Sequence, residues 1–119
     1  MQQLVIQNCV ACREGEVPLS DEEATQLLAQ VPSWHIVDRD DMKRLENTFR
    51  FDNFTHALAF TNRVGDLAEM QAHHPLIITE WGKVTVAFWT HAIGGLHLND
   101  FIMAARTDQA FASAEGRLN

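Results

Sequence analysis

The sequence predicts an α+β domain, a two-layer sandwich in which helices cover one face of a four-stranded antiparallel sheet. Three observations predict this fold. Two pairs of short segments alternate apolar and polar residues, as half-buried strands do, and only a turn separates the members of each pair. A long segment with helical periodicity joins the two pairs, and shorter helical segments precede and follow them. The order α-β-β-α-β-β-α is typical of helices packed on one side of an antiparallel sheet.

Length and composition fit one small domain. The chain has 119 residues, of which 46% are hydrophobic, and its net charge is −7. A modest core is expected at this size, and small domains often gain stability as homo-oligomers. The negative charge and the lack of a Lys/Arg run argue against direct nucleic-acid binding. No apolar stretch approaches the ~18 residues of a membrane span, and the N-terminus lacks signal-peptide features. We therefore expect a cytoplasmic protein without a membrane partner.

Residues 1–18 are predicted to be a poorly structured N-terminal arm, and residues 19–119 the folded domain. The arm carries a Cys-x-x-Cys motif, Cys9 and Cys12. Such a pair suits half of a zinc site or a redox centre. A closed zinc site needs four ligands, and no second cysteine pair exists. We favour an arm without a catalytic role, with metal binding and redox sensing as alternatives.

The first half of the domain should contain one helix and one hairpin. Ser20 and Glu23 have the spacing of a capping box, and Pro32 ends the helix that follows. Alternation predicts strands over 34–37 and 43–51, with a turn at 38–41. The second strand should bury one face, formed by Leu45, Asn47, Phe49 and Phe51.

The second half should begin with a long helix that Asp52 or Asn53 caps and that ends before Pro75. Its predicted buried face comprises Phe54, Ala57, Leu58, Thr61, Val64, Leu67 and Ala68. Strands are expected over 76–81 and 83–90 with a turn at 80–83, then a break at Gly94-Gly95 and a helix from near His97 that buries Phe101, Ile102 and Ala105. The outer sheet face, with Thr85, Ala87 and Trp89, is apolar enough to hint at association through the sheet.

Histidines and carboxylates concentrate around the end of the long helix. His73 and His74 precede Pro75, and His91 ends the last predicted strand. Histidine titrates near pH ~6.5, so it can give and take protons at cellular pH. Glu69 lies four residues before His73, so the two should share a helical face if the helix continues. A strand end and a helix end can meet at one sheet edge, which predicts a shared site.

Proton transfer is the chemistry that these residue types suit best. A histidinium can protonate a leaving hydroxyl, a neutral imidazole can remove a proton, and a carboxylate such as Asp100 can fix a histidine tautomer. Asp100 could instead be a plain helix N-terminal acid. A three-histidine metal centre is the main chemical alternative, but no His-Glu-x-x-His spacing supports it. The other histidines, expected to be caps or solvated residues, are His35, His56 and His97.

The spacing of this cluster resembles the pterin-4a-carbinolamine dehydratase family. The similarity covers roughly Ser20 to Thr107, and its element order matches that family's fold. The Cys9/Cys12 arm and the stretch 79–84 are similar to proteobacterial members that accompany phenylalanine hydroxylase. The matching signature residues are Glu69, His73, His74, Pro75, Trp81, His91 and Asp100.

The resemblance implies an enzyme that removes water from 4a-hydroxytetrahydropterin to give quinonoid dihydropterin, without a metal or organic cofactor. This reaction recycles the pterin of aromatic amino acid hydroxylases. By resemblance, His73 and His91 are the acid/base pair, and His74 orients the pterin and shares in proton transfer. The remaining signature positions would bind substrate or support the histidines: Glu69, Pro75, Trp81 and Asp100.

The resemblance also implies a homodimer through the sheets, commonly a homotetramer, and it makes phenylalanine hydroxylase a candidate partner. Two alternatives stay open. One is a protein-interaction module, because some animal relatives stabilise a homeodomain transcription factor. The other is a dehydratase for another pterin, such as a molybdopterin-related species. One departure is Ala72, where animal members tend to have Asp, which puts only a secondary orienting contact in doubt.

Overall fold

The computed structural model describes residues 3–10 and 15–118 and confirms the predicted α+β fold and element order. The described residues also form two short 3₁₀ helices, η1 and η2, and none of their helices is long and apolar enough to cross a membrane. The elements are η1 (Leu4–Ile6), α1 (Asp21–Leu28), β1 (His35–Arg39), β2 (Met42–Arg50), α2 (Phe54–Gln71), β3 (Leu76–Glu80), β4 (Lys83–Phe88), η2 (His91–Ile93) and α3 (Leu98–Ala112).

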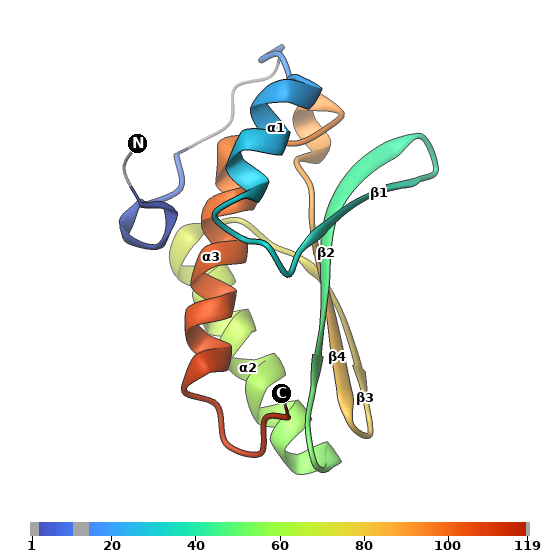
Figure 1. Cartoon of the computed structure of the whole chain (residues 1–119), viewed down its shortest axis with the longest axis vertical. Coiled ribbons are helices and arrows are strands. Elements are labelled where there is room, and N and C mark those ends of the chain that lie inside the picture. Colours follow the sequence, from blue (N-terminus) through green and yellow to red (C-terminus); the bar gives the residue numbers. More distant parts are fainter. Residues whose placement is uncertain (1–2, 11–14, 119) are drawn as a thin grey trace.

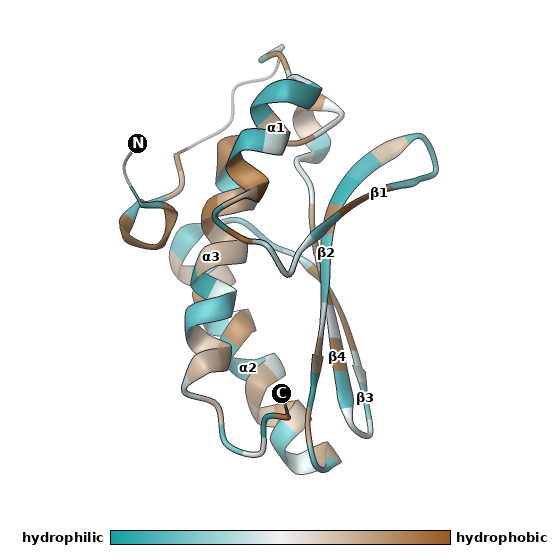
Figure 2. Cartoon of the chain, viewed as in Figure 1, coloured by the Kyte–Doolittle hydropathy of each residue, from teal (hydrophilic) through white to brown (hydrophobic). Residues whose placement is uncertain are grey.

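The four strands form one antiparallel sheet in the order β1-β2-β4-β3. The three α-helices lie on one side of this sheet, with α2 and α3 next to each other (Figure 1). Hydrophobic and hydrophilic residues mix along every strand (Figure 2). Because successive residues point to opposite faces of the sheet, one face can pack against the helices while the other face points away from them. The sheet and helices together place the end of α2 beside the start of α3.

Local capping determines where the helices begin. The Ser20 hydroxyl accepts a hydrogen bond from the amide of Glu23 at 3.1 Å, and the Glu23 carboxylate accepts from the amide of Ser20 at 2.9 Å. The predicted capping box is thus confirmed. Asn53, rather than Asp52, caps α2 by accepting from the amide of His56 at 2.8 Å.

The first hairpin has a tighter turn than the sequence predicted. Only Asp40 and Asp41 form it, with φ angles of 53° and 61°. Positive φ at both central residues suits the twist of a two-residue hairpin turn, and Asp tolerates that conformation better than most residues. β1 therefore continues to Arg39, and the four-residue turn expected at 38–41 was too long.

The core lies between the helices and the inner sheet face. Leu45, Phe49 and Phe51 are buried there as predicted. The predicted face of α2 was partly wrong, because Phe54 and Leu58 are exposed while Phe60 is buried. The Phe60 ring lies 5.0 Å from the ring of Phe49 and 5.2 Å from that of Phe51, measured between centroids. These aromatic contacts turn α2 so that its buried stripe runs through Ala57, Phe60, Val64 and Ala68.

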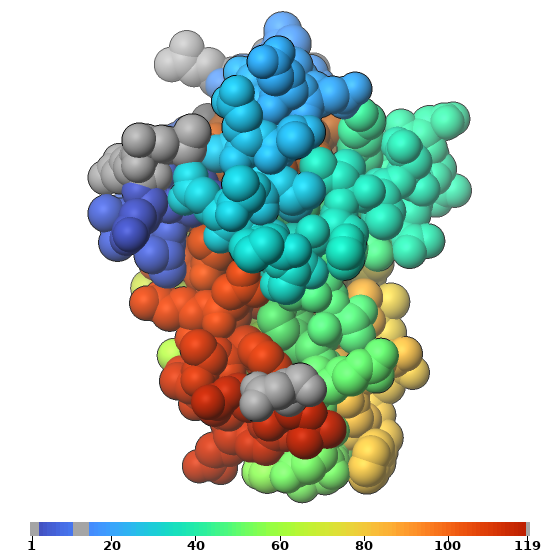
Figure 3. Space-filling model, viewed as in Figure 1, coloured from blue at the N-terminus to red at the C-terminus, as the bar shows by residue number. Residues whose placement is uncertain are grey.

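The described part of the N-terminal arm packs onto the domain, which differs from the poorly structured arm that the sequence predicted. Leu4 in η1 is only 1% exposed, and its amide donates to the Gln30 side chain at 3.2 Å. In the space-filling view the dark blue residues of this segment lie beside α3 (Figure 3). Cys12 lies outside the described residues. The division into an arm of residues 1–18 and a domain of residues 19–119 stays a prediction.

Asp108 in α3 makes stability depend on pH. Its carboxylate accepts a hydrogen bond from the indole of Trp34 at 2.8 Å, and burial raises the pKa of Asp108 from 3.8 to about 6. A raised carboxyl pKa means that the folded state holds this proton more tightly than the unfolded state does. The stabilisation that comes from the protonated Asp108 carboxyl is therefore fully present below pH 3.8 and is lost as pH rises from there through about 6.

We expect Asp108→Asn to raise the melting temperature at about pH 7.5 and to change it little at about pH 3.5, where the carboxyl is protonated in the folded and the unfolded state alike. Asparagine keeps an acceptor for Trp34 but removes the buried charge that forms above pH 6. Thermal unfolding of both proteins at the two pH values is the measurement. Parallel pH profiles for wild type and variant would contradict this account.

Candidate functional site

A cleft of about 600 Å³ lies where the end of α2, the start of η2 and the start of α3 meet. His73, His74 and His91 all line it, as do Cys9 and Val10 of the N-terminal arm. Its volume is within the usual range for sites that bind small molecules. The structure thus brings the three histidines of the sequence cluster to one cavity.

His73 owes its position to the way in which α2 ends. Ala72 adopts the left-handed conformation, with φ 52° and ψ 40°, and the chain leaves the helix after it. The His73 imidazole then stacks on the Phe88 ring at a centroid distance of 6.2 Å and an interplanar angle of 13°. Its Nε2 atom lies 2.6 Å from Oδ1 of Asp100. His73 is thereby held between a β4 aromatic ring and an α3 carboxylate.

Asp100 joins three elements through its buried carboxylate. The residue has 0% exposure. Oδ1 faces His73, and Oδ2 accepts from the Thr90 hydroxyl at 2.9 Å and from the amide of His97 at 2.9 Å. The helix-capping and functional interpretations of Asp100 are therefore both compatible with the structure. Because a carboxylate only accepts, this contact favours a proton on Nε2 of His73 and leaves Nδ1 of the neutral ring as acceptor.

The predicted pairing of Glu69 with His73 is wrong. Glu69 Oε2 lies 2.7 Å from His74 Nε2 instead, and both side chains are largely exposed. The expected pairing required α2 to continue through residue 73, whereas it ends at Gln71 and the left-handed Ala72 redirects the chain. Glu69 consequently supports the second histidine, and Asp100 supports the first.

His91 is exposed and begins η2, directly after the buried Thr90. Backbone hydrogen bonds between Thr90 and Gly95 close this loop at 2.9 Å and 3.4 Å. A Cβ atom on Gly95 would lie 2.9 Å from the Pro18 side chain, so the close approach of the arm requires glycine here. The loop keeps His91 at the cleft, next to the Thr90–Asp100 contact.

Two residues of the sequence signature lie outside this group. Pro75 stands between His74 and the start of β3 and is half-buried. Trp81 lies in the β3–β4 turn, at the opposite end of β3, and is 69% exposed. The described residues that line the cleft include neither of them. Their substrate-binding roles stay predictions.

The other histidines have structural surroundings. His97 caps α3 by accepting from the amide of Asn99 at 3.0 Å, and its Nε2 lies 2.9 Å from Glu16. His56 lies 2.6 Å from Asp52, and His35 is exposed on β1. These positions agree with their interpretation as caps or solvated residues.

Thr90 and Cys9 are among the site residues that sequence reasoning missed. Thr90 donates to Asp100, and no local pattern singles out a threonine for that contact. Cys9 was noticed only as part of a motif in an arm. Within residues 3–10 and 15–118, no three His, Cys, Asp or Glu side chains are grouped as metal ligands, so the three histidines do not have the arrangement of a zinc site.

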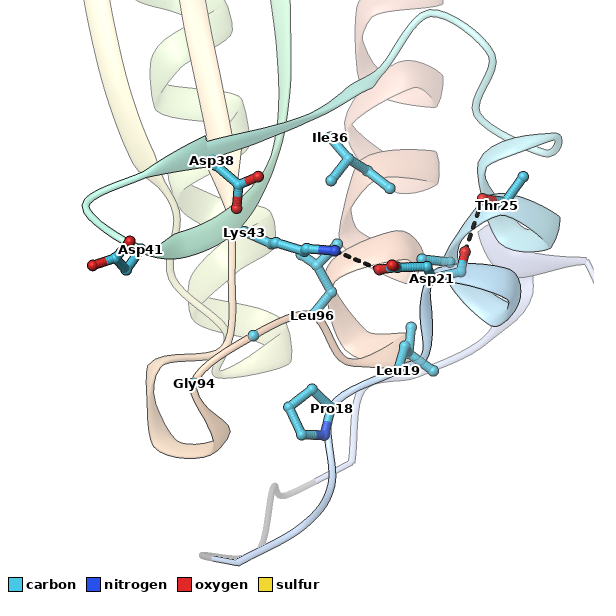
Figure 4. A pocket seen from close by; sticks show the side chains of 12 residues that line it. Pro18, Leu19, Asp21, Thr25, Ile36, Asp38, Asp41, Lys43, Gly94 and Leu96 are labelled. Atoms are coloured by element: carbon cyan, nitrogen blue, oxygen red, sulfur yellow. Dashed lines mark hydrogen bonds and ion pairs between the residues drawn. The ribbon is translucent and has the colours of Figure 1, made fainter.

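A second pocket of about 410 Å³ lies between α1, the β1–β2 turn and the Gly94–Gly95 loop. Figure 4 shows the Lys43 side chain reaching Asp21, with Asp38 and Asp41 on the hairpin beside it. No histidine lines this pocket. It is acidic and holds none of the clustered proton-transfer groups, so the histidine cleft is the better candidate for chemistry.

Comparisons with known proteins identify the family of this chain. The family model for pterin 4 alpha carbinolamine dehydratase matches residues 17–110. A Chlorobium luteolum protein named "putative pterin-4-alpha-carbinolamine dehydratase" is 55% identical over 103 residues, which cover 87% of this chain and 90% of that protein.

Two solved structures share the fold. The transcriptional coactivator/pterin dehydratase from Brucella melitensis has a TM-score of 0.71 and 26% identity, covering 78% of this chain and 97% of that one. A pterin dehydratase-like protein, described as a RuBisCO assembly factor in the alpha-carboxysome, has a TM-score of 0.57 and 22% identity, covering 69% and 93%. The latter likeness concerns the fold alone. With a family model matched over most of its length and a relative at 55% identity, this chain belongs to the pterin 4 alpha carbinolamine dehydratase family.

Proposed function

We propose that this protein removes water from a 4a-hydroxytetrahydropterin by histidine acid–base catalysis and so recycles the cofactor of an aromatic amino acid hydroxylase. Membership of the family supports dehydratase activity. The observation that carries the histidine mechanism is the contact between His73 and the buried carboxylate of Asp100, at a cleft that His91 also lines. That arrangement orients one imidazole and places a second one nearby.

The reaction needs only proton movement. The lone pair of a ring nitrogen forms a double bond to C4a while the C4a–O bond breaks. One proton goes to the leaving hydroxyl and one leaves a ring nitrogen, so water is released and no electrons enter or leave the substrate. His73 and His91 are assigned as the groups that exchange these protons, since imidazole does both near neutral pH.

His74 has a different assignment, as the residue that binds and orients the pterin. Its side chain is 62% exposed and hydrogen-bonded to Glu69, which is also exposed. Such a solvated pair suits contact with the polar edge of a ligand more than buried proton transfer. Trp81 and Pro75 are assigned to substrate binding by family resemblance alone.

A homodimer through the outer sheet face is part of the proposal. Leu76 and Ile78 are exposed on β3, which is an edge strand. Ala87 is already buried within the chain, and the Arg44 guanidinium lies 4.1 Å from the centroid of the Trp89 ring. The exposed apolar side chains that a second copy of the chain could cover thus lie on β3 rather than on β4. Phenylalanine hydroxylase stays a predicted partner.

The test of the function is a stopped-flow assay that follows loss of 4a-hydroxytetrahydropterin. The wild-type protein should accelerate this loss over the spontaneous rate. No acceleration would favour one of two alternatives, a different pterin substrate or a protein-interaction role. The Brucella structure, whose name joins a coactivator with a dehydratase, is the observation that favours the interaction role as second candidate.

We expect chelators to leave the activity unchanged. The described residues offer no grouped set of metal ligands, and the proposed chemistry uses imidazole groups only. The measurement is the stopped-flow rate before and after incubation with EDTA and gel filtration. A rate that falls with EDTA and returns with added zinc would contradict the proposed mechanism.

A further inference from the structure

The N-terminal arm reaches the histidine cleft through a segment, residues 7–10, that we call the strap. Asn99 of α3 hydrogen-bonds to both backbone polar groups of Val10, the last residue of the strap. The Asn99 carbonyl oxygen, Oδ1, accepts from the amide of Val10 at 3.0 Å, and Nδ2 donates to the Val10 carbonyl at 2.6 Å. Asn99 is 2% exposed, so these hydrogen bonds are shielded from water. The Asn99 side chain thus pairs with both backbone hydrogen-bonding groups of Val10, as a neighbouring β-strand would.

Two further side chains hold the rest of the strap. Arg106 of α3 donates to the Gln7 carbonyl at 2.6 and 3.0 Å and to the Asn8 side chain at 3.0 Å. Gln71, the last residue of α2, accepts from the amide of Cys9 at 2.7 Å and donates to Asn8 at 3.2 Å. The strap therefore connects α2 to α3 at the cleft, beside η1 (Figure 1).

The strap presents mainly apolar groups to the cleft. Cys9 and Val10 line it together with the three histidines. Val10 is 64% exposed. Ligand sites typically combine apolar walls with a few polar groups that fix orientation. The histidines supply the polar groups of this cleft, and the strap supplies part of an apolar wall.

We propose that the strap is a substrate-binding wall, with Cys9 and Val10 contacting the bound pterin and Asn99, Gln71 and Arg106 acting as positioning residues. This inference rests on the proposed function, which identifies the ligand as a pterin. The hydrogen bonds that hold the strap come from Asn99, Gln71 and Arg106, whereas the hydrogen bond that holds His73 comes from Asp100. A wall that contacts the substrate before and during the reaction contributes uniform binding, which changes KM and leaves kcat nearly unchanged.

The first arm of the test compares Arg106→Met with Arg117→Met. Arg106 holds the strap without lining the cleft, and Arg117 is a matched arginine that donates to the Ala114 carbonyl at 3.1 Å near the C-terminus. Loosening the strap adds an ordering cost to binding. We expect Arg106→Met to raise KM, and Kd for 7,8-dihydrobiopterin, about fivefold, with kcat within about twofold. Arg117→Met should match wild type.

The second arm measures contact directly. In a Cys12→Ser protein under reducing conditions, alkylation of Cys9 by iodoacetamide is followed by mass spectrometry. Saturating 7,8-dihydrobiopterin should slow alkylation at least about fivefold, while adenosine should not. The slowing should weaken in the Arg106→Met background at a fixed pterin concentration.

The outcomes separate this inference from the proposed function. If wild type dehydrates and binds the pterin while Arg106→Met leaves KM and Kd unchanged, or Cys9 alkylation is unaffected, the strap inference is overturned and the function stands. If Arg106→Met lowers kcat as strongly as it raises KM, the strap is not a binding wall. If wild type neither binds nor dehydrates the pterin, both proposals fall.

Discussion

Replacing His73 with alanine should lower kcat by about 10²-fold or more, the usual scale for a lost general acid or base. Among the described residues, the His73 imidazole is the titratable side chain that Asp100 contacts at the cleft, and an alanine side chain cannot exchange a proton. His91→Ala should have an effect of similar size, because the reaction needs one proton delivered and one removed. Stopped-flow loss of 4a-hydroxytetrahydropterin is the measurement.

Two further variants separate the loss of the His73 imidazole from general damage to the protein. The His73 side chain is only 13% exposed, so alanine could loosen the fold, and His73→Gln keeps a donor for Asp100 without proton-exchange chemistry. His35→Ala is the matched control, since His35 is exposed on β1 and does not line the cleft. Small and equal effects at positions 73, 91 and 35 would remove the catalytic assignment.

Replacing Asp100 with asparagine should also lower kcat about 10²-fold while the protein stays folded. The carboxylate faces three donors, namely the His73 ring, the Thr90 hydroxyl and the His97 amide. Oδ2 must stay an oxygen because it accepts from two of them, so the amide nitrogen of asparagine must face His73. His73 then has to accept at Nε2 and carry its proton on Nδ1, which is the reverse tautomer.

Nitrogen-15 NMR of the His73 ring tests this reversal directly, because the two tautomers differ in which nitrogen is protonated. Asp108→Asn is the matched control, since it makes the same substitution on the same helix at a site outside the cleft. We expect that control to keep the wild-type tautomer and kcat. An Asp100→Asn protein with the wild-type tautomer or full kcat would show that Asp100 only caps α3.

Several local features of the fold could be predicted because their causes lie within a few residues. The capping box at Ser20 and Glu23 and the turn predicted at 80–83 depend on neighbours three or four positions away. The structure confirms the capping box and has the turn between β3 and β4, at Trp81-Gly82. The buried face of α2 was less predictable. Periodicity identifies a broad apolar stripe, but the aromatic rings of Phe49 and Phe51 decide that Phe60 is its centre.

By itself, the sequence determined the order of the elements, the residue types around the cleft and the membership of a family. The tertiary structure alone decided that Asp100 rather than Glu69 holds His73, that Trp81 lies in the β3–β4 turn away from the cleft, and that the arm reaches the cleft. The physical reason is the sequence separation over which each kind of interaction acts. Period and capping act through neighbouring residues, whereas the contact of His73 with Asp100 joins positions 27 apart and that of Val10 with Asn99 joins positions 89 apart. Packing of α2, α3 and the sheet brings these groups together, and no local pattern encodes that packing.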